Sequence, residues 1–302
     1  MKKIKKIEIG SISEFVSEIC KLRSELSKID ISKNEILLFR GHSSEEYELI
    51  PSLGRNGYVN HEAMIINTVM NKRPDLFRYD MMPLQRLALM QHYGIPTRLL
   101  DVTENPLVAL YFACCSNNDK NAEVIVFKYN DVRSNETFID NAIAESYLLI
   151  NSITGTSIND FVSTAANRPY YALEKYYIEQ KHPDERGKAK WIKECCKCLN
   201  FVNAPFYSLR QRMQSGRYIL FPNHINNEKD SFTPRIDPID KKSSVINCIF
   251  IVPSTIKKDI LDDLKQFGIS RGSLFCDSVD EMCADIRESY QQMISEYQYQ
   301  LC

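Results

Sequence analysis

The segment Gln91-His-Tyr-Gly-Ile-Pro-Thr-Arg-Leu-Leu-Asp-Val-Thr103, followed by Glu-Asn-Pro-Leu-Val-Ala-Leu-Tyr-Phe-Ala113, stands out in this sequence. Its first thirteen residues hold five side chains that can bind a ligand or transfer a proton: Gln91, His92, Arg98, Asp101 and Thr103. Gly94 and Pro96 interrupt the polar run, and an apolar helical pattern follows it. Loops that only connect elements seldom concentrate so much polar chemistry. The segment therefore predicts part of a binding or catalytic site.

A second polar cluster lies upstream, in Leu38-Phe-Arg-Gly-His42. It closes the apolar run Ile36-Leu37-Leu38, which is typical of a short buried strand. We predict that the two polar segments form one site.

The composition is that of an ordinary globular chain. Of the 302 residues, 44% are hydrophobic and 25% are charged, and 38 basic residues against 39 acidic ones give a net charge of −1. The whole molecule is therefore not expected to attract nucleic acid or anionic lipid. Binding of such a partner would need a local basic cleft. The start of the chain lacks the apolar run of a signal peptide, and no stretch approaches the roughly 18 apolar residues of a membrane span. We expect a cytoplasmic protein without membrane contact.

Neither the cysteines nor the glycines form a cofactor motif. The CxxC in Cys195-Cys-Lys-Cys198 has no second ligand pair, whereas a structural zinc site needs four ligands. We expect free thiols in a reducing compartment and no metal ion. With ten glycines and neither GxGxxG nor GxxxxGK[ST], the chain has no glycine-rich phosphate loop, which disfavours Rossmann and P-loop nucleotide sites.

Periodicity predicts strands and helices in mixed order. Strands are expected at 34–39, 123–129, 217–221, 245–252 and 273–275, and helices at 11–27, 61–71, 83–92, 103–116, 254–267 and 278–296. Because no strict strand–helix–strand rhythm is present, the pattern favours an α+β fold. We expect a single domain over 1–302, with a core from about 30 to 275, flanking helices at 11–27 and 278–296, and a helical insertion at about 140–200.

Thr103 has two interpretations. It precedes a helical pattern, where threonine is a common N-cap because its hydroxyl accepts a hydrogen bond from the first helical turn. Alternatively, its hydroxyl belongs to the site.

The tripeptide Phe39-Arg40-Gly41 and the block 91–113 resemble the FRG domain family, which is named for that tripeptide. Leu49-Ile-Pro-Ser-Leu-Gly-Arg55 extends the resemblance, and a weaker similarity continues through Arg212-Met-Gln-Ser-Gly-Arg-Tyr218 and 249–275. Val102 stands where a tryptophan is common in the family, which we interpret as a change in packing. The family has no settled biochemistry, so this resemblance implies a domain and not a reaction.

The chain also resembles, more distantly, the ADP-ribosyltransferase folds. In these folds a first strand carries an arginine, a second ends in Ser or Thr before a helix, and a late strand supplies an acidic or amide residue. Arg40, Thr103 and Gln214 follow that order here. The resemblance implies a central split, mixed sheet surrounded by helices, with NAD as the substrate.

Cleavage of the nicotinamide bond of NAD requires groups that hold a pyrophosphate and a ribose. Arg40 suits a bidentate contact with phosphate, and Gly41 lets the backbone approach a ligand closely. Arg55 and Arg98 are further candidate phosphate ligands, each with the alternative of a buried ion pair. For Arg98, the candidate partner is Asp101.

The acid–base groups are less well defined. Transferases that modify protein side chains present a glutamate where this chain has Gln214, and an amide cannot take a proton at neutral pH. Loss of a general base costs ~10²–10⁴ in rate, and Asp101 or His92 could supply the base instead. His92 is equally compatible with a core histidine bonded to backbone, and Gln91 with a side chain that bonds loop backbone.

The sequence leaves two functions open. The first is an NAD-using enzyme of the ADP-ribosyltransferase type, either a mono-ADP-ribosyltransferase or an NAD glycohydrolase, in a bacterial intracellular toxin or phage-defence effector. Its acceptor, protein or nucleic acid, is undetermined, and a partner protein encoded nearby is a further hypothesis. The alternative is a non-catalytic module that senses a nucleotide-like small molecule. A nuclease is disfavoured because the paired carboxylates for a metal are missing.

Overall fold

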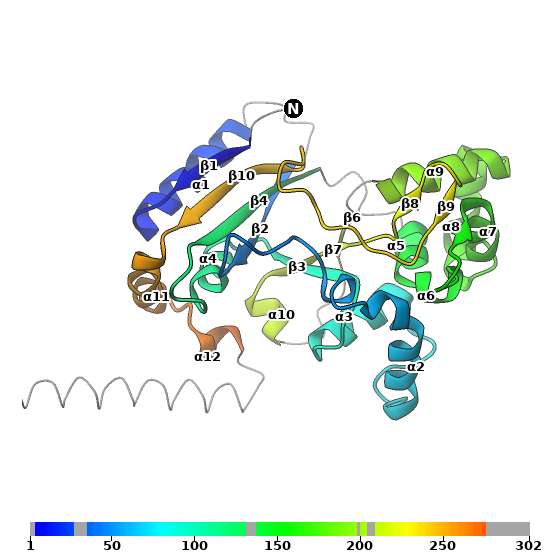
Figure 1. Ribbon diagram of the computed structural model, residues 1–302, viewed down its shortest axis with the longest axis horizontal. Coiled ribbons are helices and arrows are strands. Elements are labelled where there is room, and N and C mark those ends of the chain that lie inside the picture. The colour runs from blue at the N-terminus through cyan, green and yellow to red at the C-terminus, as the bar shows by residue number, and fades with distance from the viewer. Residues whose placement is uncertain (1–3, 27–34, 131–136, 198–199, 204–208, 276–302) are drawn as a thin grey trace, which may run out of the picture.

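The computed structural model describes residues 4–26, 35–130, 137–197, 200–203 and 209–275. Within this part of the chain, seven strands form a mixed sheet in the order β1-β10-β4-β2-β3-β7-β6 (Figure 1). β1 runs parallel to β10, and the other neighbours are antiparallel. The strands of this sheet are β1 (Lys5–Glu8), β2 (Glu35–His42), β3 (Leu99–Thr103), β4 (Ala122–Asn130), β6 (Asn200–Val202), β7 (Gly216–Leu220) and β10 (Ile246–Val252).

Helices surround this sheet, and a small second sheet joins them. The α-helices are α1 (Ile12–Leu26), α2 (Glu62–Lys72), α3 (Pro83–His92), α4 (Pro106–Cys114), α5 (Thr137–Ala144), α6 (Ser146–Leu149), α7 (Ile158–Ala165), α8 (Pro169–Lys181), α9 (Glu185–Lys197), α10 (Leu209–Met213), α11 (Lys257–Gln266) and α12 (Arg271–Leu274). The small sheet has the order β5 (Thr156–Ser157), β9 (Ser231–Phe232), β8 (Ile225–Asn226). Short 3₁₀ turns lie at Ser52–Gly54, Tyr58–His61 and Ser254–Ile256.

β4 is apolar on both faces because both faces are covered. Val124 and Val126 pack into a core shared with α1, α4 and α11. The alternate residues Ile125 and Phe127 pack into a second core on the opposite face, under the segments that follow β2 and precede β10. A strand buried on both sides has a continuous apolar sequence in place of an alternating one. This explains why the sequence predicts β4 so clearly.

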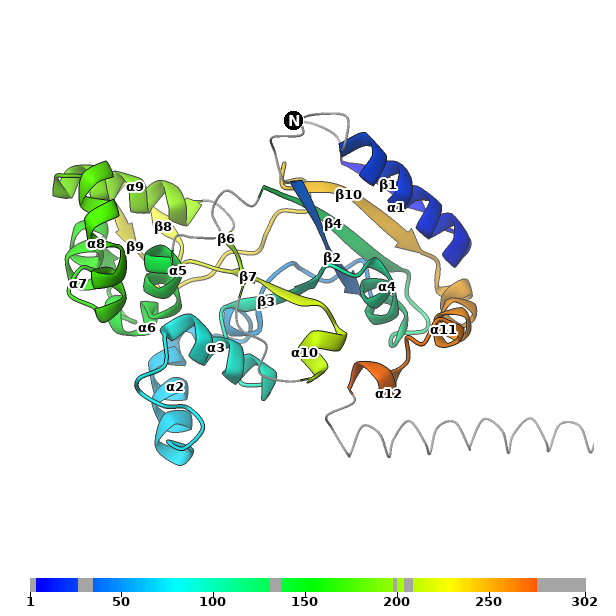
Figure 2. The same cartoon turned by 180° about the vertical axis from the view of Figure 1, so that it is seen from behind.

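A third core holds the helices α2, α3 and α5–α9 together beside the β3–β7–β6 side of the sheet (Figure 2). Leu87 of α3, Phe138 of α5 and Ile192 of α9 belong to it. It reaches the sheet through Tyr218 and Leu220 of β7. This arrangement places the C-terminal end of α3 next to the central strands.

The structure confirms an α+β arrangement with a mixed sheet, and it corrects several boundaries. The strand predicted at 273–275 is wrong: Ser270 and Ser273 form a reciprocal capping box that begins helix α12 there. The helix predicted at 103–116 begins instead after Asn105, whose side chain accepts the hydrogen bond of Leu107 N. The helix predicted at 278–296 lies outside the described residues.

The two central strands β2 and β3 pair at a single position, Phe39 opposite Thr103. Beyond it, β2 continues along β4 as far as His42, whereas β3 pairs over its whole length with β7. Residues 40–42 and 99–102 therefore diverge, and the sheet is split at its centre.

Helix α4 packs across this split, and Gly41 makes the packing feasible. A Cβ at position 41 would lie 1.9 Å from the carbonyl oxygen of Ala109 and 2.6 Å from the amide nitrogen of Ala113. Both atoms belong to the backbone of α4, so no side chain can move aside. The packing of α4 against β2 therefore requires a glycine at position 41.

We expect Gly41→Ala to lower the free energy of unfolding by about 3 kcal/mol, near the upper end of the cost of overpacking. The added methyl group must push α4 away from β2. Urea unfolding followed by circular dichroism measures this change.

Gly187→Ala is the matched control. Gly187 lies in α9, and a Cβ added there would meet only side-chain atoms of Asp184, at 3.5 Å or more. Alanine also favours a helix over glycine by up to ~1 kcal/mol. Equal losses in the two variants would show that steric contact with α4 does not explain the role of Gly41.

Candidate functional site

The split between β2 and β3 contains a cavity of about 390 Å³. This volume lies within the range of small-molecule sites. Its wall combines β2 and the turn after it, the end of α3, β3, α4, α10 and the start of β7. The cavity therefore joins segments that are far apart in the sequence.

Most of the predicted site residues meet here. Those that line the cavity are Arg40, Gly41, Arg55, Gln91, His92, Asp101, Thr103 and Gln214. Arg98 is the exception and lies elsewhere.

Arg40 extends from β2 and is held on two sides. Its Nη1 donates to the carbonyl oxygen of Asp101 at 2.5 Å, and its Nε donates to Nε2 of His42 at 3.1 Å. Burial lowers the pKa of Arg40, and the nearby charge of Asp101 opposes that shift. A guanidinium nevertheless remains protonated in proteins. Its Nη2 has no hydrogen-bond partner among the described residues and can donate to an anionic ligand.

Asp101 is exposed in the middle of β3, and Gln91 orients it. Nε2 of Gln91 donates to Asp101 Oδ2 at 2.8 Å, while Oε1 of Gln91 accepts from Thr97 Oγ1 at 2.6 Å. Gln91 therefore bonds two side chains and not the loop backbone that the sequence interpretation gave it. Asp101 is the one carboxylate that lines the cavity within the described residues.

Thr103 is buried, and its hydroxyl donates to the carbonyl oxygen of Gln214 at 2.6 Å. It also accepts from Asn105 N at 3.0 Å, so it is not the N-cap of α4. Gln214 donates through Nε2 to the carbonyl oxygen of Leu274 at 3.1 Å. Thr103 thus fixes the backbone of Gln214 beside β3, and Oε1 of Gln214 is left as the atom able to accept from a ligand hydroxyl.

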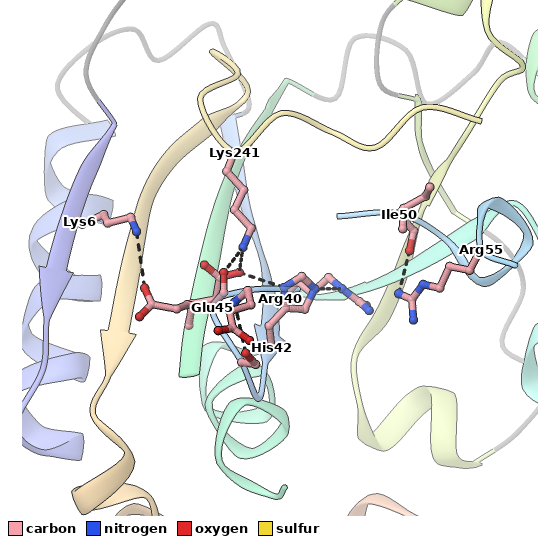
Figure 3. A network of polar contacts seen from close by, with 10 residues as sticks. Lys6, Arg40, His42, Glu45, Ile50, Arg55 and Lys241 are labelled. Carbon is pink, nitrogen blue, oxygen red and sulfur yellow. Dashed lines mark hydrogen bonds and ion pairs between the residues drawn. The ribbon is translucent and has the colours of Figure 1, made fainter. Parts of the chain in front are cut away.

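The remaining predicted residues have distinct environments. Arg55 is exposed and donates through Nη2 to the carbonyl oxygen of Ile50 at 2.9 Å, so it is not a buried ion-pair member. Figure 3 shows Arg40 and Arg55 extending toward the same space. His92 is half-buried at the end of α3 with its ring against Tyr93, and it lines the cavity, unlike a core histidine. Gly41 lines the cavity too, but its missing side chain makes room for α4 and not for a ligand.

Arg98 forms a buried ion pair, as its alternative interpretation allowed, but with a different partner. Its guanidinium is 0% exposed, and it forms a two-pronged contact with Glu62 at 2.9 and 2.5 Å. Nη1 donates to the carbonyl oxygen of Phe221 and to Asn223 Oδ1. The hydrogen-bonding capacity of Arg98 is committed inside the protein, so its role as a phosphate ligand and its expected pair with Asp101 are both wrong.

The structure adds residues that the sequence interpretation did not assign. Arg210 and Tyr47 line the cavity, and His42 contacts Arg40. Arg210 precedes Gln214 by four residues, a helical spacing that could have suggested a shared face. His42 follows Arg40 by two residues in a strand, which puts both on one face. No comparable sequence signal marks Tyr47.

The charge of the cavity wall is positive. Arg40, Arg55 and Arg210 line it together with the single carboxylate of Asp101. The whole chain has a net charge of −1, so this basic character is local. The cavity is therefore suited to an anionic ligand.

A metal centre is not apparent in the described part of the chain. It contains no group of three or more His, Cys, Asp and Glu side chains placed to hold an ion. Cys195 and Cys196 are buried in α9, and Cys198 lies outside the described residues.

We expect Arg98→Met to lower the free energy of unfolding by about 3–5 kcal/mol, because it leaves the carboxylate of Glu62 buried without its partner. Arg73→Met is the control, since Arg73 forms the same two-pronged contact with Asp75 at the surface. An exposed pair contributes about 1 kcal/mol or less. Chemical denaturation measures both, and similar losses would contradict the structural role of Arg98.

Comparison with known proteins gives one finding. The family model of the FRG domain matches residues 35–122. No curated protein and no solved structure matches the chain. Among the described residues, none of the helices has the length and apolar character to cross a membrane.

The matched segment runs from β2 through β3 and α4 to the first residue of β4, and so includes Arg40, Asp101 and Thr103. It ends before Gln214, where the sequence predicts only weaker similarity. The chain thus contains an FRG domain, which supplies β2, β3 and α4 of the cavity wall.

Proposed function

We propose that the cavity binds NAD and promotes cleavage of the bond between nicotinamide and ribose. The observation that carries this proposal is that Arg40, Thr103 and Gln214 line one basic cavity, although they come from three separate strands or strand ends. The order of these residues is that of ADP-ribosyltransferase folds, and the sheet is split between the first two of them.

The pyrophosphate of NAD fits the arginines. Arg40 and Arg55 reach into the cavity from β2 and from the turn beyond it, and each has nitrogen atoms not used by the contacts described above. Guanidinium groups bind phosphate oxygens through paired, charge-assisted hydrogen bonds. Arg210 adds a third positive charge on the α10 side.

Asp101 is suited to the reacting sugar. When the bond between C1′ and nicotinamide breaks, both electrons leave with nicotinamide and the ribose becomes an oxocarbenium-like cation. A carboxylate held in place by Gln91 stabilises that cation without having to reorient. Water or an acceptor group then attacks C1′, and Asp101 takes its proton.

Gln214 has a supporting role in this proposal. Its Oε1 can accept a hydrogen bond from a ribose hydroxyl, but an amide cannot remove a proton. Attack by water would make the protein an NAD glycohydrolase, and attack by a protein or nucleic-acid group would make it a mono-ADP-ribosyltransferase. Either activity would fit an intracellular toxin or a phage-defence effector.

A non-catalytic nucleotide sensor is the second candidate. The observation that favours it is that an amide, Gln214, stands where transferases have a glutamate, and that this amide is tied to the carbonyl oxygen of Leu274. In that case the cavity binds its ligand without turnover.

We expect purified protein to release nicotinamide from NAD, and Asp101→Asn to slow this release by ~10²–10⁴ while NAD still binds. Arg40→Ala removes charged hydrogen bonds to phosphate and should weaken NAD binding by about tenfold or more. Chromatographic detection of nicotinamide and calorimetric titration with NAD measure the two effects. Mass spectrometry of a lysate incubated with NAD identifies an acceptor.

Arg217→Ala is the matched control. It removes one positive charge from β7, but Arg217 pairs with Glu104 at 2.8 Å and does not line the cavity. NAD binding and turnover should stay unchanged in this variant. Binding without nicotinamide release would support the sensor, and the absence of NAD binding in the wild-type protein would exclude the NAD-using enzyme.

A further inference from the structure

We propose that His42 is a positioning residue: by accepting a hydrogen bond from Arg40, it holds the guanidinium in the cavity, so that ligand binding requires a neutral His42. The proposal rests on the proposed function only in taking Arg40 as the group that binds the anionic part of the ligand. The contact between the two side chains can be tested without any ligand.

The geometry fixes the protonation state of the imidazole. A guanidinium can only donate, so Nε2 of His42, at 3.1 Å from Nε of Arg40, must carry no proton. A carboxylate can only accept, so Nδ1, at 3.0 Å from Oε1 of Glu123, must carry one. His42 is therefore the neutral Nδ1–H tautomer. Its ring links Glu123 on β4 to Arg40 on β2 through these two hydrogen bonds.

Lys241 lies at the far end of this series of contacts and pairs with Glu123. Its Nζ lies 2.6 Å from Oε1 of Glu123 and donates to the carbonyl oxygen of Glu45 at 2.7 Å (Figure 3). Glu123 is 1% exposed, and its Oε2 has no hydrogen-bond partner among the described residues. Lys241 thus places the opposite charge beside this buried carboxylate. Because a carboxylate accepts, Nδ1 of His42 is the donor in their contact.

Protonation of His42 would break the contact with Arg40. It would place an N–H on Nε2, facing the N–H of Arg40 Nε, and bring two positive charges together in a buried place. The groups that face His42 are Glu123 from β4, Lys241 from the segment before β10, Arg40 from its own strand, and the ring of Tyr47 at 6.0 Å. Of these, only Glu123 favours the charged ring.

The direction of the pH effect follows from these contacts. Burial, above all, lowers the pKa of His42 below its ordinary value of 6.5; the hydrogen bond with Glu123 opposes this, and Arg40 and Lys241 add to it. His42 is thus neutral at pH 7, and the contact with Arg40 is complete. Affinity for an anionic ligand should fall as the pH falls through the pKa of His42.

Nitrogen-15 NMR of the histidine rings tests the contact itself. His42→Gln assigns the resonances of His42 among the five histidines of the chain. We expect the Nδ1–H tautomer at pH 7.5, a higher pKa of His42 in Arg40→Met, and a lower one in Glu123→Gln. An Nε2–H tautomer, or a pKa that is indifferent to Arg40→Met, would overturn the proposal. If His42→Gln does not fold, the resonance that shifts in Arg40→Met provides the assignment.

Calorimetric titration with ADP-ribose tests the consequence. We expect the affinity of the wild-type protein to fall severalfold between pH 7.5 and 5, with a midpoint at the pKa of His42 measured by NMR. In His42→Gln the affinity should no longer depend on pH in this range. The same pH dependence in His42→Gln would refute the positioning role.

His92→Gln is the control for the other histidine of the cavity. Arg40 donates to His42 and not to His92. The fall in affinity should therefore persist in His92→Gln. If ADP-ribose binds at no pH, the proposed function fails, while the NMR experiment still decides whether His42 holds Arg40.

Discussion

The close contact between α4 and β2 is the constraint on which the site depends. Gly41 has no side chain, so the backbone of α4 can lie directly against β2 at Ala109 and Ala113. The helix packs across the point where β2 and β3 separate, and these strands share only the pair Phe39–Thr103. A sheet opened at its centre would otherwise expose unpaired strand edges. The covered split supplies a cavity where polar side chains meet.

The two arginines Arg98 and Arg40 have different roles. Arg98 and Glu62 neutralise each other completely and join α2 to the start of β3. Arg40 instead bonds neutral acceptors, a backbone oxygen and the imidazole of His42. The same residue type is structural in one place and available in the other, because only one of them is paired with a carboxylate.

Local patterns were sufficient for much of the fold. The strands β4 and β10 have apolar runs because both faces are buried, and α1 and α11 have clear helical periodicity. The sequence did not predict β1, because its lysines leave it without an apolar run. This strand forms by pairing with β10. The strand expected at 273–275 failed because the capping contact between Ser270 and Ser273 favours a helix.

Local periodicity in the sequence was enough to mark the strand and helix ends beside which Arg40, His92 and Gln214 stand. The individual role of each residue arises only from long-range packing. Arg98 lies in the same polar segment as Asp101, yet its partner, Glu62, is 36 residues away. His42 gains its role from Glu123, which is 81 residues away. Such partners depend on how distant strands and helices pack, and no local pattern of residues encodes them.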